Sequence, residues 1–258
     1  MLKRLMLSTL LALAISQAAL AAGEGTAVGV DPDAVARLSA DRVLHVGEDV
    51  SVGERIITGK SGQVQILFDD STRLVVGPGS SLLIETYLMA SSSTAQKIAI
   101  DALGGSFRFI TGNSPKSAYS IDTPTASIAV RGTEFDLVVT PKTTGVMLYE
   151  GALTLCNKAS ECQELDSRCE VGLASRADAL LYLRADPDRI PLSLQFRYAR
   201  FQTGLLRDFR VSGATNCTEQ RSTEATPLST TSGSDAEPEP SRTQPQTQSP
   251  GLTLTPRQ

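Results

Sequence analysis

The sequence predicts an all-β domain of short, mainly antiparallel strands, arranged as a sandwich or as a solenoid-like stack. Between about Val43 and Leu173, apolar and polar side chains alternate in about ten short runs, of which residues 63–68 are typical. Successive side chains of a strand emerge on opposite faces, so a period of two is the signature of a half-buried strand. Turn-forming stretches such as Asp69-Asp70-Ser71-Thr72 and Gly77-Pro78-Gly79 separate the runs. Almost no helical periodicity occurs before Ala174, which favours an all-β class.

The first residues have the pattern of a secretory signal peptide. Lys3 and Arg4 precede an apolar run from Leu5 to Ile15, and small residues follow up to Ala21. We expect cleavage after about residue 21, which places the mature chain in the periplasm of a Gram-negative-like bacterium or outside the cell, without a transmembrane span. An uncleaved anchor is the alternative, because residues 5–22 reach roughly the 18 residues that begin to span a bilayer.

The remaining chain divides into four predicted parts. Residues 22–42 form a small, polar N-terminal extension that lies loosely over the edge of the β domain at residues 43–173. Residues 174–217 are predicted to be a helical extension, with a short helix over residues 176–183 and a longer one from Pro191 to about Phe209. Residues 218–258 are rich in Ser, Thr, Pro, Glu and Gln, and are predicted to be a disordered tail.

The longer predicted helix carries an apolar stripe and several arginines. The stripe recurs at spacings of four and three and consists of Leu194, Tyr198, Phe201 and Leu205. One interpretation is a terminal helix that docks this stripe on the sheet. The other is a basic amphipathic segment that binds anionic lipid or a groove of a partner.

Charge and aromatic content argue against two classes of binding protein. Loss of Lys3 and Arg4 with the signal peptide changes the net charge from -4 to about -6, so the mature chain gains little from phosphate neutralisation and we expect no nucleic-acid partner. The chain has no Trp, which argues against a carbohydrate platform of stacked indoles. Tyr87, Tyr119 and Tyr149 remain candidate contacts for a polysaccharide.

Four cysteines, Cys156, Cys162, Cys169 and Cys217, lie late in the folded region. In an oxidising compartment they should pair, and three connectivities are possible. Cys156 and Cys162 end two strand-like runs that flank the turn at residues 157–161, so this pair, together with Cys169–Cys217, is favoured. The second bridge would then join the C-terminal helical region to the sheet. A zinc site is the alternative, but no histidine lies near these cysteines.

No group of residues in the sequence provides catalytic chemistry. His45 is the only histidine, and its apolar neighbours indicate a strand at the sheet margin. Asp69 and Asp70 are adjacent, so they form a turn rather than an acid–base pair. Gly59-Lys60-Ser61 is followed by a strand instead of the helix that a phosphate-binding loop requires. We therefore expect a protein that is not an enzyme and that has no cofactor and no metal.

Three blocks in fixed order carry a family resemblance. The first covers residues 52–59 and 62–78, the second runs from Thr123-Pro124 through Arg131-Gly132-Thr133 to Phe135, and the third covers residues 146–155 with Glu150-Gly151. Together they resemble a FecR domain, the periplasmic part of the ferric-citrate regulator family, over roughly residues 41–173. The region of Cys156 and Cys162 is similar to exported stand-alone members of that family.

The resemblance implies an all-β domain that transmits or organises signals at the cell envelope. In the regulator branch it also implies an N-terminal cytoplasmic module that restrains a sigma factor, a single membrane span, and contact of the periplasmic domain with an outer-membrane receptor. Only four residues precede the apolar run here, so we expect the sigma-regulator part to be missing. Within the second block, Arg131-Gly132-Thr133 is either a structural corner, with Arg131 paired to Glu134 or Asp136, or a recognition site at an exposed edge.

Two functions are consistent with these features. The first is a non-enzymatic periplasmic interaction or signalling module that binds an unidentified envelope protein with its sheet surface or an exposed strand edge. The alternative is a structural protein that binds the cell wall, with peptidoglycan or another polysaccharide as its partner.

Overall fold

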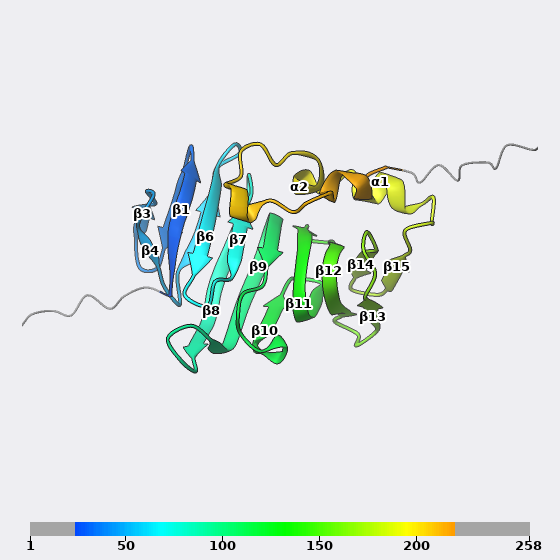
Figure 1. The fold of residues 1–258 in the computed structure, drawn as a ribbon, viewed down its shortest axis with the longest axis horizontal. Coiled ribbons are helices and arrows are strands. Elements are labelled where there is room, and N and C mark those ends of the chain that lie inside the picture. The colour runs from blue at the N-terminus through cyan, green and yellow to red at the C-terminus, as the bar shows by residue number, and fades with distance from the viewer. Residues whose placement is uncertain (1–23, 220–258) are drawn as a thin grey trace, which may run out of the picture. The chain divides into compact units, whose positions relative to one another are not determined.

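The computed structural model describes residues 24–219, and these residues are dominated by β-strands (Figure 1). The signal peptide expected at residues 1–21 lies outside the described residues, as does nearly all of the tail expected at residues 218–258. The strands of the described part are β1 (Gly25–Asp31), β2 (Ala34–Arg37), β3 (Asp41–Val43), β4 (Asp49–Val50), β5 (Arg55–Thr58), β6 (Gln63–Phe68), β7 (Arg73–Val76), β8 (Ser81–Met89), β9 (Ala95–Ile110), β10 (Tyr119–Asp122), β11 (Ala126–Val139), β12 (Thr143–Asn157), β13 (Cys162–Leu165), β14 (Val171–Ser175) and β15 (Ala179–Tyr182).

Three long strands, β9, β11 and β12, each take part in two layers of the sheet. The first part of β9 pairs with β8 and β10, whereas residues 105–110 pair with β7 and β11. Likewise, β12 pairs with β14 near its start and with β13 near its end. One layer therefore contains β1, β4, β6, β7, β14 and β15, and the other contains β2, β3, β5, β8, β10 and β13, with parts of the three long strands in both.

Alternating side chains from the two layers fill one core between them. Val64, Ile66 and Phe68 on β6 belong to this core, and so do Phe107 and Phe109 on β9. From the other layer, the core receives side chains such as those of Ile98, Ile100, Ile128, Leu153 and Leu155. The period-two pattern of the sequence thus marks the side chains that face the opposite layer, and the all-β prediction is confirmed.

Residues 24–42 are part of the sheet, contrary to the expectation that residues 22–42 lie loosely over its edge. β1 pairs with β6 along its length, from Gly25 opposite Phe68 to Asp31 opposite Gln63. A side chain at Gly25 would meet the Phe68 ring at 3.0 Å, so the small residue is needed for close packing. β2 pairs with both β3 and β5.

The C-terminal region contains helical turns, but neither of the two helices expected there. Residues 179–182 form β15, which pairs with β14 through a turn in which the Ser175 hydroxyl accepts bonds from two backbone N–H groups. The longer expected helix is divided into short pieces, because the backbone is extended at Phe196 and at Phe201. The pieces are α1 (Arg189–Ser193), α2 (Arg197–Arg200), η2 (Arg207–Phe209) and η3 (Ala214–Cys217).

Residues 184–217, which we call the C-terminal cover, pack on the outer face of the layer that contains β7. Phe196, Ala199 and Val211 cluster with Met147 and Tyr149 of β12. Nearer β7, a second cluster combines Val75 of the sheet with Tyr198, Leu205 and Phe209. Only half of the expected apolar stripe is buried: Tyr198 and Leu205 face the sheet, whereas Leu194 and Phe201 are exposed. Figure 1 shows the cover running along one side of the strands.

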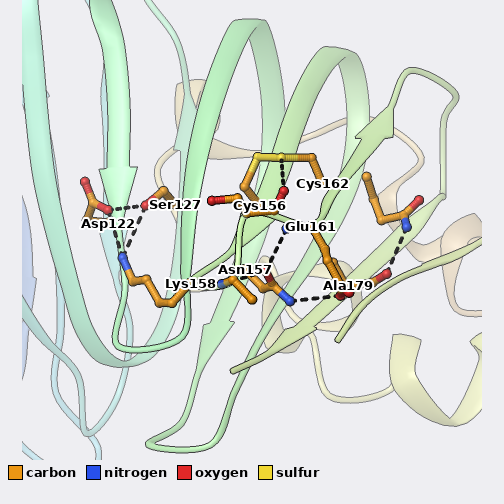
Figure 2. The surroundings of a disulfide bond; sticks show 11 residues. Asp122, Ser127, Cys156, Asn157, Lys158, Glu161, Cys162 and Ala179 are labelled. Carbon is orange, nitrogen blue, oxygen red and sulfur yellow. Dashed lines mark hydrogen bonds and ion pairs between the residues drawn. A yellow bond between two sulfur atoms is a disulfide. The ribbon is translucent and has the colours of Figure 1, made fainter. Parts of the chain in front are cut away.

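Two disulfides fix the late strands and the end of the cover. Cys156 and Cys162 join β12 to β13 across the turn at residues 157–161 (Figure 2), with an S–S distance of 1.98 Å. Cys169 and Cys217 are also bonded, and they connect the loop before β14 to the last turn of the cover. This is the connectivity that the sequence favours, and no cysteine is free.

Candidate functional site

The glycines of the second and third blocks form a corner where β11 and β12 pass from one layer to the other. Gly132 and Gly151 both have positive φ, at 67° and 80°. A Cβ atom on Gly151 would lie 1.9 Å from the carbonyl oxygen of Gly132. The pairing register of the two strands shifts between Arg131 and Glu134, next to this contact. The corner therefore requires a residue without a side chain at position 151.

Replacement of Gly151 tests this role. We expect Gly151→Ala to lower the free energy of unfolding by about 2 to 3 kcal/mol, because the methyl group adds a steric conflict to an unfavourable φ. Gly79→Ala is the matched control, since Gly79 has a φ of 63° but no atom within 4 Å of the added Cβ. Urea unfolding of both variants with the disulfides intact gives the comparison. Equal losses would contradict a steric role for Gly151.

The exposed residues of the corner form ion pairs other than those expected. Arg131 pairs with Glu164 of β13, and not with Glu134 or Asp136. Both side chains of this pair are about half exposed, so the pair contributes little to stability. Asp136 instead pairs with Arg108 beneath the C-terminal cover. Arg131 is thus accessible at the surface, as the recognition interpretation requires, while Gly132 is the structural corner.

The other residues of the family blocks are structural. Thr123 is buried at the turn into β11, where its hydroxyl contacts the Thr144 hydroxyl at 2.7 Å and accepts a bond from the Ala126 N–H at 2.8 Å. Pro124 is half-buried beside it, in the turn between β10 and β11. Phe135 lies in the core, stacked on Phe109 with ring centroids 5.2 Å apart. Thr133 is buried behind the corner, and its backbone N–H donates to the Thr111 hydroxyl.

A row of charged side chains crosses the strands beside the corner. Glu134 of β11 lies opposite Glu150 of β12, and Ile110 separates Glu134 from Arg73 of β7. Burial raises the pKa of Glu134, and the charge of Glu150 raises it further, while Arg108, Arg168 and Arg73 oppose this change. Glu150 itself is exposed. The structure thus brings Arg131, Gly132, Thr133, Glu150 and Gly151 together, and places Thr123 and Pro124 at a different turn.

The three tyrosines considered as polysaccharide contacts are buried. Tyr87, Tyr119 and Tyr149 are each no more than 7% exposed. The hydroxyls of Tyr87 and Tyr119 donate to the buried carboxylate of Asp70, and that of Tyr149 donates to Asp136 at 2.7 Å. Burial raises the pKa of all three hydroxyls, which keeps them protonated as donors. The prediction that these residues contact a glycan is therefore wrong.

The edge of the sheet at β3 is the most exposed apolar part of the described chain. Leu38, Val43 and Val46 are 66%, 58% and 65% exposed, and these are the highest values among its large apolar side chains. They surround β3, which pairs only with β2. We call these three residues with strand β3 the β3 edge. The sequence contains a signal for it, since Val43, Leu44 and Val46 form a short apolar run that follows Arg42 and is interrupted by His45, but this region was expected to be an N-terminal extension and a sheet margin.

Backbone groups at the β3 edge are available for pairing. The Leu44 N–H donates to the Ala34 carbonyl, and Arg42 lies opposite Ala36, so these positions face β2. Because bonded and non-bonded positions alternate in an antiparallel pair, the N–H and C=O groups of Asp41 and Val43 point away from β2. The Arg42 guanidinium holds β3 in place by hydrogen bonds to the carboxylates of Glu48, at 3.0 Å, and Glu54, at 2.9 Å.

Neither a metal-binding cluster nor a membrane-spanning helix occurs in residues 24–219. This part of the chain has no group of three or more His, Cys, Asp or Glu side chains placed to hold a metal ion. Within the same range, no helix combines the length and the apolar character needed to cross a bilayer.

Comparison with known proteins gives a family assignment for part of the chain. The model of the family described as FecR protein matches residues 54–154, which include β5 to β11 and most of β12. No protein with a curated description matches the sequence.

Two similar solved structures are crystal structures of a candidate anti-sigma factor from Parabacteroides distasonis ATCC 8503. Their TM-scores are 0.43 and 0.41, at 13% and 14% sequence identity. The first alignment covers 54% of this chain and 63% of the other, and the second covers 50% and 58%. The chain thus spans less than two thirds of those structures. Residues 54–154, which include the glycine corner, thus match the FecR family model, in agreement with the FecR-domain resemblance predicted from the sequence.

Proposed function

We propose that the protein is an extracytoplasmic, non-enzymatic signalling module that binds an extended segment of another cell-envelope protein at the β3 edge. The FecR domain is a regulatory and signalling type of domain, which supports a role in recognition rather than catalysis. The two disulfides are compatible with an oxidising compartment such as the periplasm.

The observation that carries the proposal is the combination of free backbone groups and exposed apolar side chains at the β3 edge. An unpaired strand edge can accept a further strand, because its N–H and C=O groups then form a ladder with the incoming chain. Val43 is both at the edge and 58% exposed, and Leu38 and Val46 extend the apolar surface beyond it. Such side chains supply the specificity that backbone bonds alone do not provide.

Site-specific photo-crosslinking in cells tests this proposal. A photoreactive phenylalanine analogue at position 43 should give one discrete adduct with an envelope protein. The same analogue at Leu180, which is 47% exposed on the strand β15 at the other end of the sheet, is the matched control and should give none.

Charge substitution then distinguishes a specific contact from proximity. Leu38→Glu with Val46→Glu should abolish the adduct at position 43, because the two carboxylates oppose apolar contact with the partner. Leu180→Glu with Leu183→Glu should leave it unchanged. An adduct of equal yield from position 180, or one that survives Leu38→Glu with Val46→Glu, would count against the β3 edge as the binding site.

A further inference from the structure

Residues 189–210 of the C-terminal cover are basic, although the chain as a whole is acidic. Between residues 189 and 210 the only acidic residue is Asp208, whereas the net charge of the chain is -4. Four arginines of this stretch, Arg197, Arg200, Arg207 and Arg210, are exposed. Within the described residues, none of the four lies within 4.0 Å of a carboxylate. Their charges are therefore not neutralised by the folded domain.

Large apolar side chains are exposed in the same stretch of the chain. Phe201 is 54% exposed, and Leu194 and Leu206 are also accessible. The Arg200 guanidinium lies 4.9 Å from the centre of the Phe201 ring. Arg197 and Phe201 line the same surface hollow of about 130 Å³. Asp31 also lines this hollow, and its single charge leaves the surface with a net positive charge.

The buried side chains of the cover fix this surface in place. Tyr198 and Leu205 are packed against β7, and the Tyr198 hydroxyl donates to Gln63 at 2.9 Å. The Leu206 N–H donates to Gln65 at 2.7 Å, which holds the chain between Phe201 and Arg207 on the sheet. The exposed side chains of these segments therefore project from a rigid support, away from the sheet.

We propose that this surface docks the protein on an anionic lipid bilayer. Arginine side chains pair with lipid phosphates, and each basic residue near an anionic surface strengthens binding. Phe201 and Leu206 would enter the boundary between headgroups and acyl chains, as the apolar residues of interfacial segments do. The charge and the exposed aromatic ring together fit a lipid surface, which offers both phosphate and an apolar layer. An acidic protein partner would require the charge but not the insertion of Phe201.

A single tryptophan at position 201 reports this insertion directly, because the chain contains no Trp. Residues 22–258, which include every described residue, are purified with Phe201→Trp and mixed with phosphatidylcholine vesicles with or without about 30% phosphatidylglycerol. We expect a blue shift of the fluorescence, and quenching by brominated acyl chains, only with the anionic vesicles. Leu38→Trp places the reporter at the β3 edge and should show neither change.

Removal of the arginines tests the electrostatic part. Arg197→Gln, Arg200→Gln and Arg207→Gln together should weaken partitioning into anionic vesicles on the order of 100-fold, since each charge contributes roughly fivefold. Arg55→Gln, Lys60→Gln and Lys97→Gln remove the same number of exposed charges from elsewhere and should have little effect. Arg210 is retained because it also bonds the Leu205 and Thr203 carbonyls.

Three results would overturn the proposal. The first is the absence of a blue shift with anionic vesicles, and the second is equal weakening by the two triple variants. The third is binding to an acidic polyglutamate peptide without binding to vesicles, which would identify the surface as a site for an acidic protein. Circular dichroism of each variant confirms that the fold is retained, so that a loss of binding reports on the surface.

Discussion

Asp136→Ala should lower the free energy of unfolding by about 3 to 5 kcal/mol, the largest effect of any single substitution considered for this domain. Asp136 and Arg108 form an ion pair beneath the C-terminal cover, and their side chains are at most 2% exposed. The carboxylate accepts two bonds from the guanidinium, at 2.7 and 2.9 Å, and one from the Tyr149 hydroxyl. Its removal leaves a buried cation whose charge has no counter-ion.

The protonation states of this group depend on the same contacts. Burial alone lowers the pKa of Arg108, but Asp136 and Tyr149 outweigh it and the pKa is raised. Burial, followed by the charge of Asp136, raises the pKa of Tyr149 and of Tyr198. Arg108 also donates to Gln202 of the cover, and its guanidinium lies 5.3 Å from the Tyr149 ring centre and 5.7 Å from that of Tyr198. The ion pair therefore links the sheet to the cover.

Two comparisons isolate the buried charge as the cause. Glu164→Ala removes the exposed partner of Arg131 and should cost at most about 1 kcal/mol. The double variant Arg108→Met with Asp136→Leu should lower the free energy of unfolding less than Asp136→Ala alone, because no unpaired charge stays in the interior. Guanidinium unfolding curves give all three values. If Asp136→Ala and Glu164→Ala lower the free energy of unfolding by the same amount, the buried ion pair contributes no more to stability than the exposed one.

Removal of the Cys169–Cys217 disulfide should have the second large effect. The bridge closes a loop with a sequence separation of 48 residues, so replacing both cysteines by alanine should cost about 4 kcal/mol in the chain-entropy model. It should also release the end of the cover, because the remaining contacts of η3 are the packing of Ala214 and a bond from the Arg189 guanidinium to the Cys217 carbonyl. Limited proteolysis should then cut first within residues 184–217.

The other disulfide is the control for this effect. Cys156 and Cys162 are separated by 6 residues, so their replacement should cost only about 2 kcal/mol. The turn they enclose is also held by Asn157, whose side-chain oxygen accepts bonds from the N–H groups of Ala159 and Glu161, both at 2.9 Å (Figure 2). Cleavage of the cover in this variant as fast as in the Cys169 and Cys217 variant would contradict a specific role of the longer bridge.

The strands and the Cys156–Cys162 disulfide follow from local sequence patterns, whereas the C-terminal cover does not. Residues 63–68 alternate because one face meets the other layer of the sheet and the opposite face meets the cover. Residues 176–183 contain helix-favouring Ala and Leu, but pairing with β14 overrides that preference. The spacing of Tyr198 and Leu205 resembles a helical stripe, yet each is buried from a separate turn.

The candidate site is formed by residues that are far apart in the sequence, so local sequence patterns predict only some of its contacts. Gly132 is recognisable as a turn residue, but its contact with Gly151 follows from the register of β11 and β12. The partner of Arg131 is 33 positions away, at Glu164. A local signal did exist for the buried pair, since Arg108 and Asp136 each stand between apolar strand residues. These charged residues indicate a buried ion pair only if another segment covers the outer face of the sheet. The sequence predicted a single helix for that segment, and not the short turns that bury Arg108 and Asp136.

Amide hydrogen exchange on the complex tests the proposed β3 edge most directly. The partner recovered by crosslinking from position 43 is purified and mixed with the unmodified protein. Pairing with a partner strand should slow exchange at the Asp41 and Val43 amides, which point away from β2, and should leave the amides of β15 unchanged. Protection confined to β15 or to the cover, or no change at Asp41 and Val43 in a saturated complex, would contradict binding at the β3 edge.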